Sequence, residues 1–103
     1  MLDTERIVGF QWDAGNRGKN QKHGVTDAEA EQLFFQPGLL VATDTGHSAM
    51  EPRCHALGIT LSGRQLHVTF TLREQGSLIR VISARDMHRK ERMVYEAHLK
   101  THS

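Results

Sequence analysis

The sequence has no long apolar runs, and it contains one cysteine and two prolines in 103 residues. No apolar stretch approaches the roughly 20 residues that cross a bilayer, so we expect no membrane association. The first residues have neither the basic end nor the apolar stretch of a secretory signal. Cys54 has no second cysteine for an internal disulfide, which is typical of a protein in a reducing cytoplasm.

The composition predicts a single globular domain over residues 1–103. Hydrophobic residues make up 38% of the chain and charged residues 24%, which excludes wholesale disorder. A chain of this length can build one modest core. No repeat or Pro/Gly-rich linker divides the sequence.

The net charge is small, but the charged residues are distributed unevenly along the chain. The formal net charge is +1, yet residues 24–52 contain none of the 13 basic residues and five of the 12 acidic ones. Such segregation can produce one positive face although the sum is near zero. The alternative is an unevenly charged, solvated surface without function.

The patterning predicts an α+β fold with an antiparallel or mixed sheet of four to five strands. Short strands are expected over residues 7–12 and 39–42, with an exposed loop over 44–52. Residues 53–59, 66–72 and 78–84 are expected as antiparallel strands. In the second of these, alternation places apolar residues on one face and polar residues on the other, namely Leu66, Val68, Phe70 and Leu72 against His67, Thr69 and Thr71. The third is apolar on both sides except for Arg80 and Ser83, which predicts a central strand buried on both faces.

Two N-terminal helices and one C-terminal helix complete this prediction. Asp13 can cap a first helix that runs to about Lys22, with Gly24 ending it in a left-handed conformation. Residues 26–29 form a capping box for a second helix, which Pro37-Gly38 stops. Asp86 can cap a final helix from Met87 to about Lys100. A hairpin loop is expected over residues 74–77.

Three groups of residues could carry chemistry. Cations gather at the end of the expected first helix, where they could equally serve as favourable charges at a helix C-terminus; they are Lys19, Lys22 and His23. Arg80 and Arg85 lie in an apolar strand, where an arginine is costly unless it is paired or reaches a cleft. Five residues apart, they point to opposite faces of a regular strand. His88, Arg92 and Tyr95 share one helical face, either as a proton-transfer and phosphate group or as a plain amphipathic surface.

Metal catalysis is not expected. The seven histidines form no HExxH motif and no zinc-type cluster with cysteine, and the acidic residues show no grouping suited to magnesium. Cys54 could be a nucleophile, but its mid-strand position with small neighbours favours a packed, inert thiol.

In order and spacing, these segments resemble the BrnT toxin family from about Ile7 to Glu96. The stretches that carry the resemblance are Phe10-Gln11-Trp12-Asp13, Lys22-His23-Gly24-Val25, Phe34-Phe35 with Pro37, Ile79-Arg80-Val81-Ile82-Ser83-Ala84-Arg85 and Arg89-Lys90-Glu91-Arg92. Gln11 stands where an acidic residue is common in that family. The resemblance implies a RelE-like fold, RNA cleavage that arrests translation, and neutralisation by a BrnA-type antitoxin. It also implies that operator DNA is bound only through the antitoxin, and that no cofactor is used.

Metal-free RNA cleavage needs a base for the 2′-hydroxyl, charge stabilisation at the phosphate and an acid for the leaving oxygen. Arginine suits the phosphate because its planar fork binds two oxygens. We therefore expect Arg80 and Arg85 to clamp the scissile phosphate, with Arg53 or Arg73 assisting.

Roles for the remaining candidates follow from the same requirements. Lys22 or His23 is the candidate base, and Tyr95 or His88 is the candidate acid. Lys19, Arg89 and Arg92 are expected to bind RNA, free or on the ribosome. Two alternatives stay open: a non-catalytic module that binds a protein or nucleic acid through its basic face, and an unrelated small nucleic-acid-binding protein.

Overall fold

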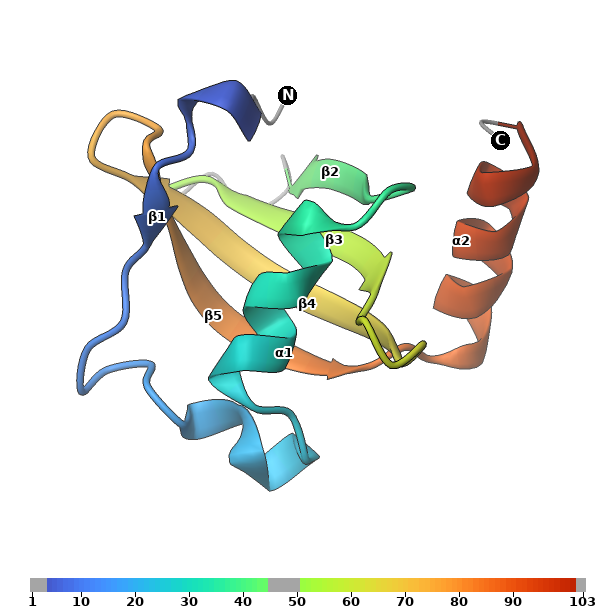
Figure 1. Cartoon of the computed structure of the whole chain (residues 1–103), viewed down its shortest axis with the longest axis horizontal. Coiled ribbons are helices and arrows are strands. Elements are labelled where there is room, and N and C mark those ends of the chain that lie inside the picture. The colour runs from blue at the N-terminus through green and yellow to red at the C-terminus, as the bar shows by residue number, and fades with distance from the viewer. Residues whose placement is uncertain (1–3, 45–50, 102–103) are drawn as a thin grey trace.

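The computed structural model describes residues 4–44 and 51–101 as a five-stranded mixed sheet with helices on both of its faces (Figure 1). The strands are β1 (Gly9–Phe10), β2 (Leu40–Asp44), β3 (Arg53–Ile59), β4 (Gln65–Arg73) and β5 (Leu78–Asp86). They lie in the order β1-β5-β4-β3-β2, and all neighbours are antiparallel except β1 and β5. The α-helices are α1 (Asp27–Gln32) and α2 (Arg89–Thr101), and the 3₁₀-helices are η1 (Thr4–Arg6), η2 (Lys19–His23) and η3 (Leu33–Phe35).

One face of the sheet is apolar and lies under α1 and η3, which cross in front of it in Figure 1. The alternation predicted for residues 66–72 is confirmed, since Leu66, Val68 and Phe70 are fully buried on this face. The same face receives the predicted second helix through Ala30, Leu33 and Phe34. This packing forms the main core of the protein.

The opposite face is mostly polar, and α2 covers only the part near β2 and β3. Tyr95 and Met87 pack there on Leu57, with Leu40 and Leu99 at the margin. The rest of this face carries the polar residues that alternate with the core positions. No helix in the described ranges has the length and apolarity to cross a membrane.

Several local predictions are confirmed. Thr26 and Glu29 form the capping box at the start of α1, each bonding the backbone N–H of the other. The 74–77 loop joins β4 to β5, and Glu74, Gln75 and Gly76 all have positive φ values. The loop expected over residues 44–52 lies mostly outside the described residues.

The predicted first helix is wrong. Residues 14–18 form turns, and only the 3₁₀-helix η2 follows. Gly18 has a left-handed φ of 69°, which interrupts a right-handed helix. Gly24 does end η2 in the left-handed conformation, with φ of 71°, as expected.

The predictions for β5 and its cap also need correction. The central strand of the sheet is β4. The strand β5 is not buried on both faces, because the side chains of Arg80, Ile82 and Ser83 are partly exposed. Asp86 is the last residue of β5 and binds Arg64 at 2.7 Å instead of capping α2. The helix begins after His88, whose N–H donates to Glu91.

Two asparagines before α1 satisfy the outer edge of β5 beyond the short strand β1. The buried Asn16 donates to the carbonyls of Gln11 and Val81 and accepts from the N–H of Asp13. Asn20, also buried, accepts from the N–H of Ala84 at 2.9 Å. Along this edge, asparagine side chains take the place of a paired strand. They bond backbone groups of β5 that would otherwise be buried without hydrogen-bond partners.

Replacing Asn16 by alanine should therefore destabilise the fold by about 2–3 kcal/mol, since it leaves buried backbone groups without partners. The melting temperature should fall by roughly 10 °C or more. Gln21→Ala, at an exposed position of η2, is the control and should change stability by less than about 0.5 kcal/mol. Equal, small effects of both substitutions in urea unfolding would show that the edge is not held by Asn16.

Candidate active site

A β-bulge in β5 brings Arg80 and Arg85 to the same face of the sheet. The register pairs Thr71 with Arg80 and His67 with Arg85, but Ile82 has no partner in β4. The extra residue reverses the alternation, so the expectation that the two arginines point to opposite faces is wrong. Both lie on the polar face, away from α1.

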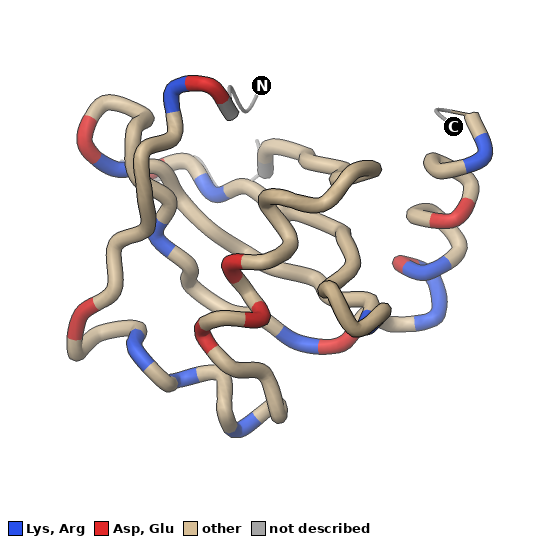
Figure 2. The backbone as a smooth tube through the Cα atoms, viewed as in Figure 1, with Lys and Arg blue, Asp and Glu red and all other residues tan. Residues whose placement is uncertain are grey.

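The same face collects polar residues from three neighbouring strands. Its members are Arg53 and His55 of β3, His67, Thr69, Thr71 and Arg73 of β4, and Arg80, Ser83 and Arg85 of β5. We call this set the arginine face. The acidic residues of α1 lie on the other side of the sheet, and Figure 2 shows them grouped along that helix with the basic residues on the elements around it.

Two guanidinium groups converge at one end of the arginine face. Arg73 and Arg80 both donate to the side-chain oxygen of Gln11, at 3.4 and 3.1 Å. A neutral acceptor thus holds two cations side by side. The strand pairing of β1 with β5 places Gln11 at this point, since its N–H donates to the carbonyl of Ile79.

Carboxylates occupy the outer sides of this pair. Asp13 accepts two bonds from Arg80, at 2.8 and 3.0 Å, and Glu51 forms an ion pair with Arg73. Hydrogen bonding from Arg80 lowers the pKa of Asp13 below its ordinary value. The Asp13 side chain is 56% exposed and that of Arg80 only 16%. An ion pair with such a solvated partner contributes little, so another anion can replace the carboxylate.

Arg85 has a different environment at the other end of the face. Both of its Nη atoms donate to Glu91 of α2, at 2.8 and 2.9 Å. The same carboxylate accepts from the N–H of His88. These bonds, led by the one from Arg85, lower the pKa of Glu91 to about 2. The pair fastens the start of α2 to β5.

Two histidines lie near the Arg85 end of the face, His67 opposite Arg85 on β4 and His55 opposite Thr69 on β3. His55 and His67 stack with ring centroids 5.1 Å apart, and Nδ1 of His55 is 3.2 Å from Nε2 of His67. Thr69 Oγ1 is also 3.2 Å from Nδ1 of His55. Burial lowers the pKa of His67, which favours the neutral form of this imidazole.

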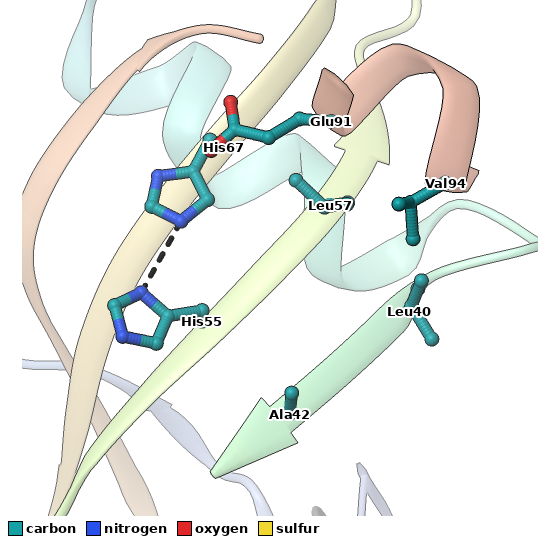
Figure 3. Close-up of a pocket in the computed structure, with 7 residues that line it drawn as sticks. All are labelled: Leu40, Ala42, His55, Leu57, His67, Glu91 and Val94. Atoms are coloured by element: carbon teal, nitrogen blue, oxygen red, sulfur yellow. Dashed lines mark hydrogen bonds between the residues drawn. The ribbon is translucent and has the colours of Figure 1, made fainter. Parts of the chain in front are cut away.

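A cavity of about 240 Å³ opens beside the histidines, between α2 and strands β2 to β4 (Figure 3). Its polar members are His55, His67 and Glu91. The rest of its lining is aliphatic and comes from Leu40, Ala42, Leu57 and Val94.

Not every predicted site residue reaches this face. Lys19, Lys22 and His23 are exposed on η2. Arg64 binds the carbonyls of His23 and Gly24 together with Asp86 and Glu29, which holds the end of η2 on the α1 side of the sheet. Among the described residues, no hydrogen bond or ion pair joins Lys22 or His23 to Arg73, Arg80 or Arg85.

The predicted site residues on α2 and just before it have different environments. His88 lies beside Glu91 and near His67. Arg89 is exposed, and Arg92, also exposed, donates to the carbonyl of Met87. Tyr95 is buried in the contact of α2 with Leu57, which raises the pKa of its phenol. The structure therefore does not bring Tyr95 to the arginine face. Cys54 lies on the opposite face and packs against the main core.

The sequence reasoning missed Gln11, His55, His67 and Glu91. A signal for His67 was present, because alternation had already placed it with Thr69 and Thr71 on the polar side of a strand. His55 has the same parity on the preceding strand as Arg53. Gln11 and Glu91 gave no such signal, since their partners are distant in sequence or follow from the bulge. Within the described residues, no three His, Cys, Asp or Glu side chains are grouped to hold a metal ion.

The protein is a small α+β protein that gathers arginines and histidines, side chains that can bind anionic groups, on one partly covered face of its sheet. Residues 12–91 match a family model described as "Ribonuclease toxin, BrnT, of type II toxin-antitoxin system". Because the match spans most of the 103 residues, the chain belongs to the BrnT family, and the resemblance seen in the sequence is confirmed. No curated protein matches the chain.

Family membership establishes the coarse role. The protein is a ribonuclease toxin, and its type II system implies an antitoxin as partner. The expected α+β class with a mixed sheet is confirmed, whereas the likeness to RelE stays a prediction.

The ion pair of Arg85 with Glu91 makes stability depend on pH. Since the pKa of Glu91 lies at about 2 in the fold against an ordinary 4.5, its stabilisation is complete above about pH 4.5 and is lost as the pH falls towards 2. With the Glu91 side chain 24% exposed, Glu91→Gln should cost about 2 kcal/mol at pH 7. Urea unfolding at pH 7, 4 and 2.5 should show the difference from the wild type shrinking. A difference that is constant over this range would contradict the role of the ionised pair.

Proposed function

We propose that the arginine face is the RNA-cleaving site of this toxin. The observation that carries the proposal is the convergence of Arg73 and Arg80 on Gln11, which places two guanidinium forks side by side on neighbouring strands. Guanidinium forks bind phosphate oxygens in pairs. The exposed carboxylates of Asp13 and Glu51 occupy positions that a phosphate can take over.

On this proposal, cleavage proceeds without a metal ion. The 2′-oxygen forms a bond to phosphorus while the bond to the 5′-oxygen breaks, and the arginines stabilise the negative charge on the phosphate. One group removes the 2′-hydroxyl proton and another gives a proton to the departing 5′-oxygen. Arg85, fixed by Glu91, positions α2 and adds positive charge at the far end of the face.

The histidine pair is the proposed proton-transfer group. His55 and His67 lie on the same face as the arginines, with His67 directly opposite Arg85 on β4 and His55 beside it on β3. His88, next to Glu91, stays a candidate acid. For Lys22, His23 and Tyr95, a direct role requires a rearrangement, because their positions are away from this face or buried.

The wider biology follows as part of the proposal. The antitoxin is of the BrnA type, RNA cleavage arrests translation, and operator DNA is bound through the antitoxin. Lys19, Arg89 and Arg92 are exposed and would guide RNA, free or on the ribosome, by charge.

A second candidate function is non-catalytic binding of an acidic protein segment. The observation that favours it is that three guanidinium groups each bind a carboxylate, those of Arg73, Arg80 and Arg85. An acidic peptide would use the same geometry. Growth arrest and RNA degradation separate the two candidates, because the binding module produces neither.

Induction of the wild type in a bacterial host should stop growth and degrade RNA, whereas Arg80→Glu should abolish both. Purified wild type should cleave RNA in the presence of EDTA, and Arg80→Gln should be slower by about 10²–10³ because it removes a donor to the phosphate. Arg6→Glu changes an exposed charge that bonds the hairpin loop at Gln75 and is the control. Circular dichroism checks the fold of each variant. Full toxicity of a folded Arg80→Glu protein would remove Arg80 from the site.

His55→Ala should lower the rate of RNA cleavage by about 10²–10⁴, the range of a lost general base or acid. His98→Ala, on the last turns of α2, is the matched control and should retain the rate. An unchanged rate in a folded His55→Ala protein would show that the proton is transferred elsewhere.

A further inference from the structure

The cavity between α2 and strands β2 to β4 presents an almost wholly apolar wall to solvent. Figure 3 shows Val94 of α2 facing Leu40 of β2 across it, with Leu57 of β3 beside them. Its volume is about 240 Å³, and an apolar cavity of roughly 150 Å³ is large enough to enclose benzene. The space can therefore hold one large apolar side chain, such as that of leucine or phenylalanine.

The protein surface beside this cavity is also apolar. Met93 and Val94 are adjacent on α2, and the two residues are 61% and 54% exposed. Ala42, which lines the cavity from β2, is exposed as well. An exposed apolar patch is typical of an interaction site, because a partner that covers it removes apolar area from water.

Three cations lie in the first turn of α2, next to this apolar pair. Arg89, Lys90 and Arg92 are all exposed. Residues four apart are neighbours on a helix surface, so Arg89 lies beside Met93 and Lys90 beside Val94. Cations at the start of a helix oppose its dipole, so the stability of α2 does not account for them. A partner that brings negative charge to this turn does.

A protein segment matches this combination better than RNA does. RNA phosphates can pair with the cations, but a base inserted in the cavity would bury the polar atoms of its edge against aliphatic side chains, which is costly. An amphipathic helix instead lays apolar side chains into a groove while its carboxylates meet the cations beside it. The partner implied for this protein is the antitoxin of its type II system.

We propose that the antitoxin docks an acidic amphipathic segment along α2. The segment inserts one large apolar side chain into the cavity, and its carboxylates pair with Arg89, Lys90 and Arg92. This contact does not require the arginine face to be catalytic. Its consequence for activity does rest on the proposed function: His55 and His67 also line the cavity, so the docked segment covers the proposed proton-transfer group.

Titration calorimetry with the purified antitoxin tests the apolar contact. Val94→Asp puts a carboxylate at the cavity and should weaken binding by about thirtyfold or more, the loss typical of a hot spot in an interface. Leu61→Asp is the matched control, because Leu61 is 74% exposed in the loop between β3 and β4 and does not line the cavity. Its Kd should stay within about twofold of the wild type, as expected outside an interface. Circular dichroism checks the fold of each variant.

Lys90→Glu tests the ionic contact in the same titration. It should weaken binding by about tenfold at low salt, because it places like charges opposite each other. The difference from the wild type should shrink at about 0.5 M salt, where exposed charges are screened. Arg6→Glu makes the same change of charge on η1, where Arg6 bonds the hairpin loop at Gln75, and should bind the antitoxin like the wild type.

An unchanged Kd in a folded Val94→Asp or Lys90→Glu protein would overturn the inference. So would a loss of RNA binding in Lys90→Glu with antitoxin binding intact, since the cations would then serve RNA. A toxin dimer that Val94→Asp dissociates in light scattering, without weakening the antitoxin, would assign the cavity to a second copy and overturn the inference too. None of these measurements uses RNA cleavage, so the inference and the proposed function can fail separately.

Discussion

The single unpaired residue of β5 determines what the exposed side of the sheet can do. Without the bulge at Ile82, Arg80 and Arg85 would point to opposite faces, and one of them would lie under α1 in the apolar core. A charge buried there would cost several kcal/mol. With the bulge, every arginine of strands β4 and β5 lies on the polar face, and the core face stays apolar. One extra residue therefore keeps the core face apolar and also brings the arginines of the candidate site to one face.

Charge pairing within the protein keeps this face ordered. Like charges repel, yet Arg73 and Arg80 lie close enough to share one amide oxygen, because Gln11 accepts from both and Asp13 and Glu51 neutralise their outer sides. Such preorganised donors lose little entropy when a phosphate arrives. The pairing of Arg85 with Glu91 differs, because it is less exposed, is bidentate and also holds the start of α2. The arginines of one face therefore divide into a pair that can exchange its anions and one that fixes a helix.

The helices α1 and α2 cover the two faces of the sheet unequally, and this leaves the arginine face open. α1 and η3 bury one face almost completely, whereas α2 covers the other only near β2 and β3. Tyr95 fills that contact, so a residue that resembles a catalytic acid in the sequence serves packing instead. The cavity lies along the margin of the same contact, where the aliphatic residues under α2 meet the histidines of the open face.

Local patterns in the sequence were sufficient for the elements whose stabilising contacts are near in the chain. The capping box of α1, the alternation in β4, the 74–77 hairpin and the left-handed Gly24 depend on neighbours within a few residues, and all are present. The family, too, was legible from the order of short motifs. The turns at residues 14–18, the bulge at Ile82 and the partners of each arginine were not, because they depend on residues such as Asn16, Gln11 and Glu51 that meet strands far away in the sequence. Sequence alone determined which residue types alternate along each strand; the tertiary structure decided which of them share a face, since that depends on strand register, and one extra residue reverses it.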